Sequence, residues 1–259
     1  MISKLFSAVA LALATSWSPQ ALAQTHVQVP GHVAAAVADV ARPPVDTARD
    51  AGRKPAEMLA FAGVKPGDKI LELIPGKGYF TRVLAKAVGP TGKVYAAEAP
   101  PYPDETGKVP SGPRPIALLA RQPGYSNISP FDLDPTKPIR SPEPVDVVWI
   151  AQNYHDFHLA ELKLDVAAAN RQLFDALKPG GTLIVIDHAA VAGAPLSVAD
   201  TLHRIDPAKA RAELEAAGFR FEGETDVLRN PADPRTASVF DPSVRGKTDQ
   251  FVYKFQKPS

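Results

Sequence analysis

The sequence predicts an α/β protein with a doubly wound, mostly parallel sheet. Strand-like apolar runs alternate with amphipathic helical runs, and glycine turns join several of them. The last two strand-like runs, near residues 219–228 and 250–255, have no helix between them. Because strands joined by helices pair in parallel and successive strands pair antiparallel, we expect a parallel sheet with an antiparallel last strand.

The first strand–helix–strand unit is the clearest part of the pattern. Lys69–Ile74 has the composition of a buried strand, and the turn Pro75-Gly76-Lys77-Gly78 leads into a helix over Tyr79–Val88. That helix places its apolar residues on one face, and Gly89 ends it. Lys93–Ala97 follows as the second strand.

Two helical segments precede this unit. A short one begins near His32, and a longer one runs from about Asp46 to Ala62 and ends at Gly63. Because Pro55 lacks the backbone N–H that a helix interior needs, it should kink the longer segment or start a new helix.

The second half of the chain continues the alternation. Residues 99–144 hold 12 of the 27 prolines, so long regular elements are not expected there. Asp206, directly before Pro207, is a typical helix N-cap. The remaining expected elements are a helix over Ile116–Arg121, a strand near Asn127–Phe131, a strand over Val145–Ile150, a helix over Leu159–Leu177, a strand over Thr182–Ile186 and a helix from Pro207 to Gly218.

The first 23 residues have the pattern of a signal peptide. Lys4 precedes an apolar run of 13 residues, and Ala21-Leu22-Ala23 provides the small-x-small pattern of a cleavage site. A helix needs about 20 residues to cross a bilayer, which favours cleavage over an uncleaved anchor. We expect residues 1–23 to be a signal peptide, 24–45 a leader segment and 46–259 one domain of a periplasmic or secreted bacterial protein.

Export gives a testable prediction. The mature protein from its native host should begin at Gln24 and remain in solution, because the cleavage site precedes that residue. Mass spectrometry of the N-terminus checks this. An intact Met1 on a membrane-bound species would contradict it.

The composition excludes several other classes of protein. The chain has no cysteine, which rules out disulfides and thiolate-bound metals. The 29 Lys and Arg residues nearly balance the 28 Asp and Glu residues, and no long run carries one sign. We therefore expect no nucleic-acid partner. No second apolar stretch is long enough to cross a membrane, so we also expect no stable membrane insertion after cleavage. The oligomeric state stays open.

Two stretches of sequence resemble the class I S-adenosyl-L-methionine (SAM) methyltransferases. The superfamily's approach to its first strand is similar to Val64-Lys65-Pro66-Gly67-Asp68-Lys69-Ile70-Leu71-Glu72-Leu73, and its turn into the fifth strand to Leu177-Lys178-Pro179-Gly180-Gly181-Thr182-Leu183. A subgroup of exported bacterial predicted methyltransferases resembles Asp50-Ala51-Gly52-Arg53-Lys54-Pro55 and Asn153-Tyr154-His155-Asp156-Phe157-His158. The resemblance covers roughly residues 46–257. It implies a Rossmann-like fold of the class I methyltransferase type, SAM as the cofactor and methyl transfer as the reaction.

The resemblance also implies five cofactor-binding residues. They are Glu72 on the first strand, Gly76 and Gly78 in the turn, Glu98 at the end of the second strand and Asp132 after the third. Glycines let backbone N–H groups approach a ligand closely at a helix N-terminus. A carboxylate at position 98 accepts both ribose hydroxyls, and Asp134 is an alternative to Asp132 for the adenine contact. The family's first motif has a glycine where this chain has Ile74, whose branched side chain would crowd the amino-acid end of SAM.

Polar residues gather where the fourth and fifth predicted strands end. Ligands of open α/β sheets bind at the carboxyl ends of strands, so these residues should lie beside the methyl donor. We expect His155 to take a proton from the acceptor, with Tyr154 and Asp156 orienting it.

The preferred function is SAM-dependent methyl transfer to a small molecule, and two other functions stay open. The His155-x-x-His158 spacing, with Asp187 or His188, allows a metal-dependent hydrolase, although we expect no metal. A non-catalytic exported ligand-binding protein is the other alternative, because SAM is made in the cytoplasm and Ile74 crowds its site.

Overall fold

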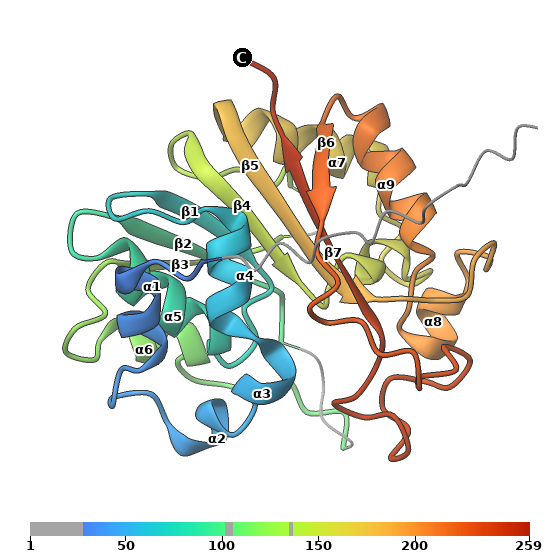
Figure 1. The fold of residues 1–259 in the computed structure, drawn as a ribbon, viewed down its shortest axis with the longest axis horizontal. Helices are drawn as coiled ribbons and strands as arrows, with labels where there is room; N and C mark the ends of the chain where they lie inside the picture. The colour runs from blue at the N-terminus through green and yellow to red at the C-terminus, as the bar shows by residue number, and fades with distance from the viewer. Residues whose placement is uncertain (1–27, 102–105, 135–136) are drawn as a thin grey trace, which may run out of the picture.

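A seven-stranded sheet in the order β3-β2-β1-β4-β5-β7-β6 forms the centre of the computed structural model (Figure 1). The structure describes residues 28–101, 106–134 and 137–259, so the predicted signal peptide lies outside the described residues. β1 to β5 pair in parallel, and β7 runs antiparallel to both of its neighbours. The predicted doubly wound sheet with an antiparallel last strand is confirmed. The strands are β1 Lys69–Leu73, β2 Lys93–Glu98, β3 Ile128–Asp132, β4 Val145–Ala151, β5 Leu177–His188, β6 Arg220–Glu224 and β7 Gln250–Gln256.

Helices cover both faces of this sheet (Figure 1). Successive strand residues point to opposite faces, so Ile70 belongs to one apolar core and Leu71 to the other. The first face carries α1 Gly31–Val37, α4 Pro55–Ala62, α5 Tyr79–Val88 and α6 Pro115–Ala120. The second face carries α7 Val166–Ala176 and α9 Pro207–Ala216. α1, which falls in the predicted leader, buries Val33 and Ala36 against α4 and α5.

Four short helices complete the described part of the chain. They are α2 Pro44–Thr47, α3 Asp50–Arg53, the 3-10 helix η1 His155–His158 and α8 Val198–Leu202. In Figure 1, α2, α3 and α8 lie below the sheet, on the side toward which β4 and β5 run. Among the described residues, no helix has both the length and the apolar character to span a bilayer.

Several predicted boundaries are confirmed. α5 runs from Tyr79 to Val88, and Pro55 starts a new helix. Asp206 caps α9, because its Oδ1 accepts a hydrogen bond of 2.9 Å from the backbone N–H of Ala208.

Two other boundaries differ from the prediction. The helix expected from Leu159 begins only at Val166, because Asp165 caps it there and Lys163 has a positive φ of 46°, which a helix excludes. The strand expected from Thr182 begins at Leu177, which pairs with the start of β4 before a bulge shifts the register.

Candidate functional site

The loop after β1 forms part of a cavity of about 210 Å³ at the carboxyl ends of β1 and β4. Gly76 lines this cavity with a φ of 57°, and a Cβ there would meet no atom within 4 Å. Gly78 has a φ of 83°, and a Cβ there would lie 3.1 Å from the side chains of Ile116 and Leu119 on α6. Of the two predicted glycines, Gly76 is therefore the one open to a ligand, and Gly78 allows the tight packing of α6.

Ile74 lines the same cavity in a backbone conformation that favours glycine. Its φ is 50°, and left-handed geometry costs a residue with a Cβ roughly 1–2 kcal/mol. Its backbone N–H donates a 2.9 Å hydrogen bond to the carbonyl of Ala97, at the end of β2. The turn thus keeps the shape of a glycine-containing loop although the glycine is replaced.

Glu72 lines the cavity from β1 as a buried carboxyl group. Its side chain belongs to a residue only 3% exposed, and its Oε2 has no hydrogen-bond partner among the described residues. Burial raises the pKa of Glu72 to about 7, although the charge of Arg53 opposes the shift. Because buried polar atoms are nearly always hydrogen-bonded, this oxygen is suited to a donor on a ligand.

Two arginines that were given no role in the sequence analysis also line the cavity. Arg49 and Arg53 lie 5.1 and 4.7 Å from the centre of the Tyr79 ring, and Arg53 donates a hydrogen bond to Gln152. Burial and the charge of Arg49 lower the pKa of Arg53 to about 10, so it stays a cation near neutral pH. Arg53 belongs to residues 50–55, one of the segments that resemble the exported subgroup. That resemblance was the sequence signal that could have identified Arg53 as a site residue.

A network of hydrogen bonds fixes these arginines in place. Asp50 on α3 accepts a 2.6 Å bond from the hydroxyl of Tyr79 and two bonds, of 2.6 and 2.8 Å, from Arg42. The Tyr79 bond ties α3, which carries Arg53, to α5, and the bidentate Arg42 pair ties α3 to the segment before α2.

Glu98 and Asp132 lie side by side at the ends of β2 and β3, as paired residues of the two strands. Arg114, just before α6, lies across both: it binds Asp132 and Ala99, and its Nε lies 3.7 Å from Glu98. Glu98 also accepts a 3.3 Å hydrogen bond from Ile116, and burial raises its pKa. The two predicted carboxylates therefore come together, but Glu98 is covered.

Asp134, the alternative to Asp132, is placed differently. It forms an ion pair of 2.8 Å with Lys137, whereas Asp132 ends β3 with its side chain 75% exposed. The position next to Glu98 is therefore occupied by Asp132.

His155 lies between two carboxylates. Its Nδ1 is 2.8 Å from Asp187 Oδ1, its Nε2 is 3.1 Å from Asp156 Oδ1, and its backbone N–H donates to Asp187 Oδ2 at 2.7 Å. Burial alone would lower the pKa of His155, but both carboxylates raise it to about 10. The ring of His155 therefore lies at the predicted end of β4 between two acceptors, and its role as the base stays a prediction.

Of the two residues expected to orient His155, Asp156 contacts the imidazole ring, whereas the Tyr154 hydroxyl bonds other residues. The Tyr154 hydroxyl donates to Glu213 at 3.0 Å and accepts from Asn170 at 2.8 Å, on the face covered by α7 and α9. His158 donates to the same Glu213 oxygen, so it points away from His155. Side chains of neighbouring residues in η1 diverge, and the sequence pattern could not show which of them face the site.

Two further histidines surround His155. The rings of His188 and His203 lie 6.0 and 5.4 Å from its ring centre. His188 shares a 2.7 Å hydrogen bond with Thr248, and burial lowers its pKa to about 4. His203 ends α8, and its ring packs against Phe240 at 4.8 Å.

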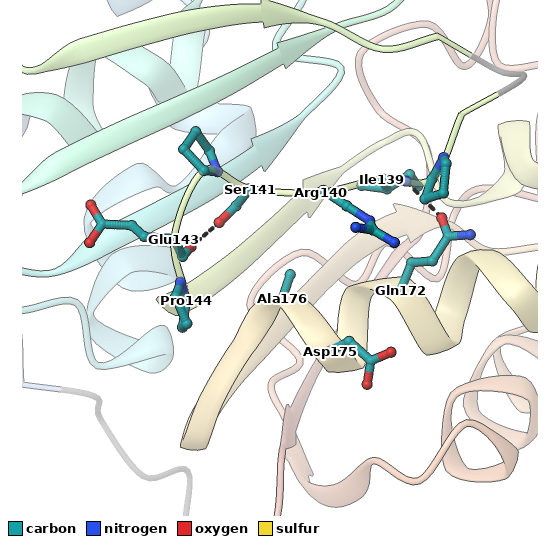
Figure 2. Close-up of a pocket in the computed structure, with 10 residues that line it drawn as sticks. Ile139, Arg140, Ser141, Glu143, Pro144, Gln172, Asp175 and Ala176 are labelled. Atoms are coloured by element: carbon teal, nitrogen blue, oxygen red, sulfur yellow. Dashed lines mark hydrogen bonds between the residues drawn. The ribbon is translucent and has the colours of Figure 1, made fainter.

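A larger hollow of about 400 Å³ lies elsewhere (Figure 2). It lies between residues 138–144 and α7, where Arg140, Glu143, Gln172 and Asp175 line it. Residues 138–144 lead into β4, so this hollow is at the amino end of that strand, opposite the cavity beside Glu72. None of the predicted site residues lines it.

The chain is thus an α/β protein with a cavity at the carboxyl ends of two parallel strands, the edge at which open α/β sheets bind ligands. No family model matches the chain. A protein-L-isoaspartate O-methyltransferase from Ignicoccus hospitalis is 31% identical over 133 residues, 50% of this chain and 52% of that relative. A protein of the same description from Methanocella arvoryzae is 28% identical over 150 residues, 54% of this chain and 75% of the relative. The chain thus spans about half the length of the first of these relatives.

Comparison with solved structures identifies the class of fold. The crystal structure of a SAM-dependent methyltransferase from Aquifex aeolicus has a TM-score of 0.54 and 21% identity, and the match covers 81% of this chain and 92% of that one. The chain therefore has the class I SAM-dependent methyltransferase fold, with distant sequence relatives among methyltransferases.

Proposed function

We propose that this chain transfers a methyl group from SAM to a small-molecule acceptor. The observation that carries the proposal is the buried, unpartnered Glu72 oxygen in a cavity that Arg49 and Arg53 also line. The amino-acid end of SAM has an ammonium group to donate to Glu72 and a carboxylate to accept from the arginines. When bound, SAM supplies the electrophilic methyl group.

The nucleoside end of the donor needs more space than the cavity provides. The cavity's volume of about 210 Å³ is below the roughly 300–1,000 Å³ of typical ligand sites, so the cavity fits the methionine portion of SAM alone. We propose that Glu98 binds the ribose and Asp132 the adenine, although Arg114 lies across both carboxylates in this structure. We expect Arg114 to move aside when the donor binds, which frees the Glu98 carboxylate for the ribose hydroxyls.

The acceptor site adjoins the donor cavity through Asn153. This residue lines the cavity, and its Nδ2 donates a 3.0 Å hydrogen bond to Asp156 in the histidine cluster. An acceptor between the two would contact His203 and Phe240, a residue that is 57% exposed.

Calorimetric titration of the mature chain with SAM and with its demethylated product tests the donor site. Glu98→Ala should weaken binding by about 1.5–3 kcal/mol, the value of hydrogen bonds to a charged group, or roughly 10- to 150-fold. Glu215→Ala is the matched control, since Glu215 is an exposed carboxylate on α9 that pairs with Arg211, and it should leave affinity unchanged. Ile74→Gly should tighten binding, because it removes the side chain that crowds the loop.

A non-catalytic exported ligand-binding protein is the second candidate. The observation that favours it is Arg114, which occupies the place where the ribose would contact Glu98. If neither the natural chain nor Ile74→Gly binds SAM, methyl transfer is contradicted and this second function becomes the preferred one.

A further inference from the structure

We infer that His155, Asp156 and His203 form a binding site for one divalent transition-metal ion, with zinc as the best match. Each residue offers one ligand atom, and the three atoms lie within 4.8 Å of one another. Asp156 Oδ1 is 3.1 Å from His155 Nε2 and 3.9 Å from His203 Nδ1. Two imidazole nitrogens and one carboxylate oxygen are a donor set that zinc and neighbouring metals prefer.

The distances between these atoms match those around a bound ion. Ligands about 2.0–2.2 Å from a tetrahedral zinc lie roughly 3.3–3.6 Å apart. The two separations from Asp156 Oδ1, 3.1 and 3.9 Å, lie just below and just above this range. Small side-chain rotations would therefore bring all three atoms to one ion. A cation at this point takes the place of the proton shared by His155 and Asp156.

Asp187 provides the outer support that metal-binding histidines usually have. It accepts from His155 Nδ1 at 2.8 Å, which leaves Nε2 as the ligand atom and fixes the ring. Asp187 is fully buried and also accepts from the backbone N–H groups of His155 and His188, so it cannot rotate away. With neutral histidines the two carboxylates give the site a charge of about −2, which a divalent cation neutralises.

The backbone at His203 adopts an unfavourable conformation that orients the imidazole ring toward His155. Its φ is 52°, in the left-handed region, where a residue other than glycine costs roughly 1–3 kcal/mol. This conformation ends α8 and brings the ring to within contact of His155. The side chains of His203 and Asp156 are 30% and 20% exposed, so one side of the site stays open to a substrate atom or water.

This site differs from the one that the sequence spacing offered. His158 binds Glu213 and lies outside the group, while His203 comes from 45 residues further along the chain. Where methyl transfer holds, which is the part that rests on the proposed function, a cation here binds the acceptor oxygen and lowers its pKa. His155 would then be a ligand and not the base, and the acceptor proton would pass to solvent water at the open side of the site.

The test uses the full chain without an affinity tag, stripped with a chelator and titrated with Zn²⁺ or Co²⁺ alone. We expect one ion per chain and, for Co²⁺, visible absorption bands of a low-coordinate site. His203→Asn should weaken binding at least 100-fold, and asparagine tolerates the left-handed backbone, so the fold is kept. Asp187→Asn should weaken it 10- to 100-fold through the ring of His155. His158→Gln is the matched control and should bind as the natural chain does.

Absence of stoichiometric Zn²⁺ and Co²⁺ binding by the natural chain would overturn the inference, whatever the variants do. Equal losses in His158→Gln and His203→Asn would overturn it as well, because they would place the ion elsewhere. No SAM is present in this titration, so its failure is distinct from failure of the donor site.

Discussion

The free energy of unfolding of the natural chain is expected to fall between pH 5 and pH 8 by about 2–3 kcal/mol more than that of Glu72→Gln. Burial raises the pKa of Glu72 from its ordinary 4.5 to about 7 in the folded protein. The folded state therefore favours the protonated carboxyl group. Its stabilising effect is complete below pH 4.5 and is lost as the pH rises to 7, at about 1.4 kcal/mol per pKa unit.

Urea denaturation at several pH values measures this difference. His155 and His188 also titrate differently in the folded and unfolded states, but they do so in both proteins and cancel in the comparison. Glu215→Gln, at an exposed position, should follow the natural chain. Parallel curves for the natural chain and Glu72→Gln would contradict the prediction. They would show that Glu72 ionises in the folded protein with no loss of stability, and thus that water reaches its carboxyl group.

Asp187→Ala should lower the free energy of unfolding by about 3–5 kcal/mol at pH 7, in the presence of a chelator. Asp187 is fully buried and accepts three hydrogen bonds, two from His155 and one from the backbone of His188. Removing one partner of a buried ion pair leaves the other charge without compensation, which is the expensive case. Chemical denaturation measures the loss.

Asp156→Ala is the matched comparison for this prediction. Asp156 contacts the other nitrogen of the same ring, but it is partly exposed, so water replaces the lost contacts. Its loss should be less than half that of Asp187→Ala. Asp187→Asn should fall between them, because the amide oxygen still accepts a backbone N–H. Equal losses at Asp187 and Asp156 would contradict the assignment of Asp187 as the residue that fixes His155.

The order of elements was predictable because it depends on local patterns. Strand-like apolar runs and amphipathic helices identified the sheet, and the glycine turn at residues 75–78 placed the loop between β1 and α5. Ile74 was recognised from sequence as a replaced glycine, and the structure shows that it keeps the glycine-like φ. Chain connectivity fixes these features, so neighbouring residues are enough to predict them.

The tertiary structure alone decided which side chains meet at the site. Arg114 covers Glu98 because α6 packs over the ends of β2 and β3. Tyr154 turns toward α9 while His155, one residue later, turns toward Asp187 on β5. These contacts join segments far apart in the sequence, and their geometry depends on how helices pack against the sheet. No periodicity within one segment carries that information, so the sequence by itself determined the fold class, and packing determined which side chains meet at the strand ends.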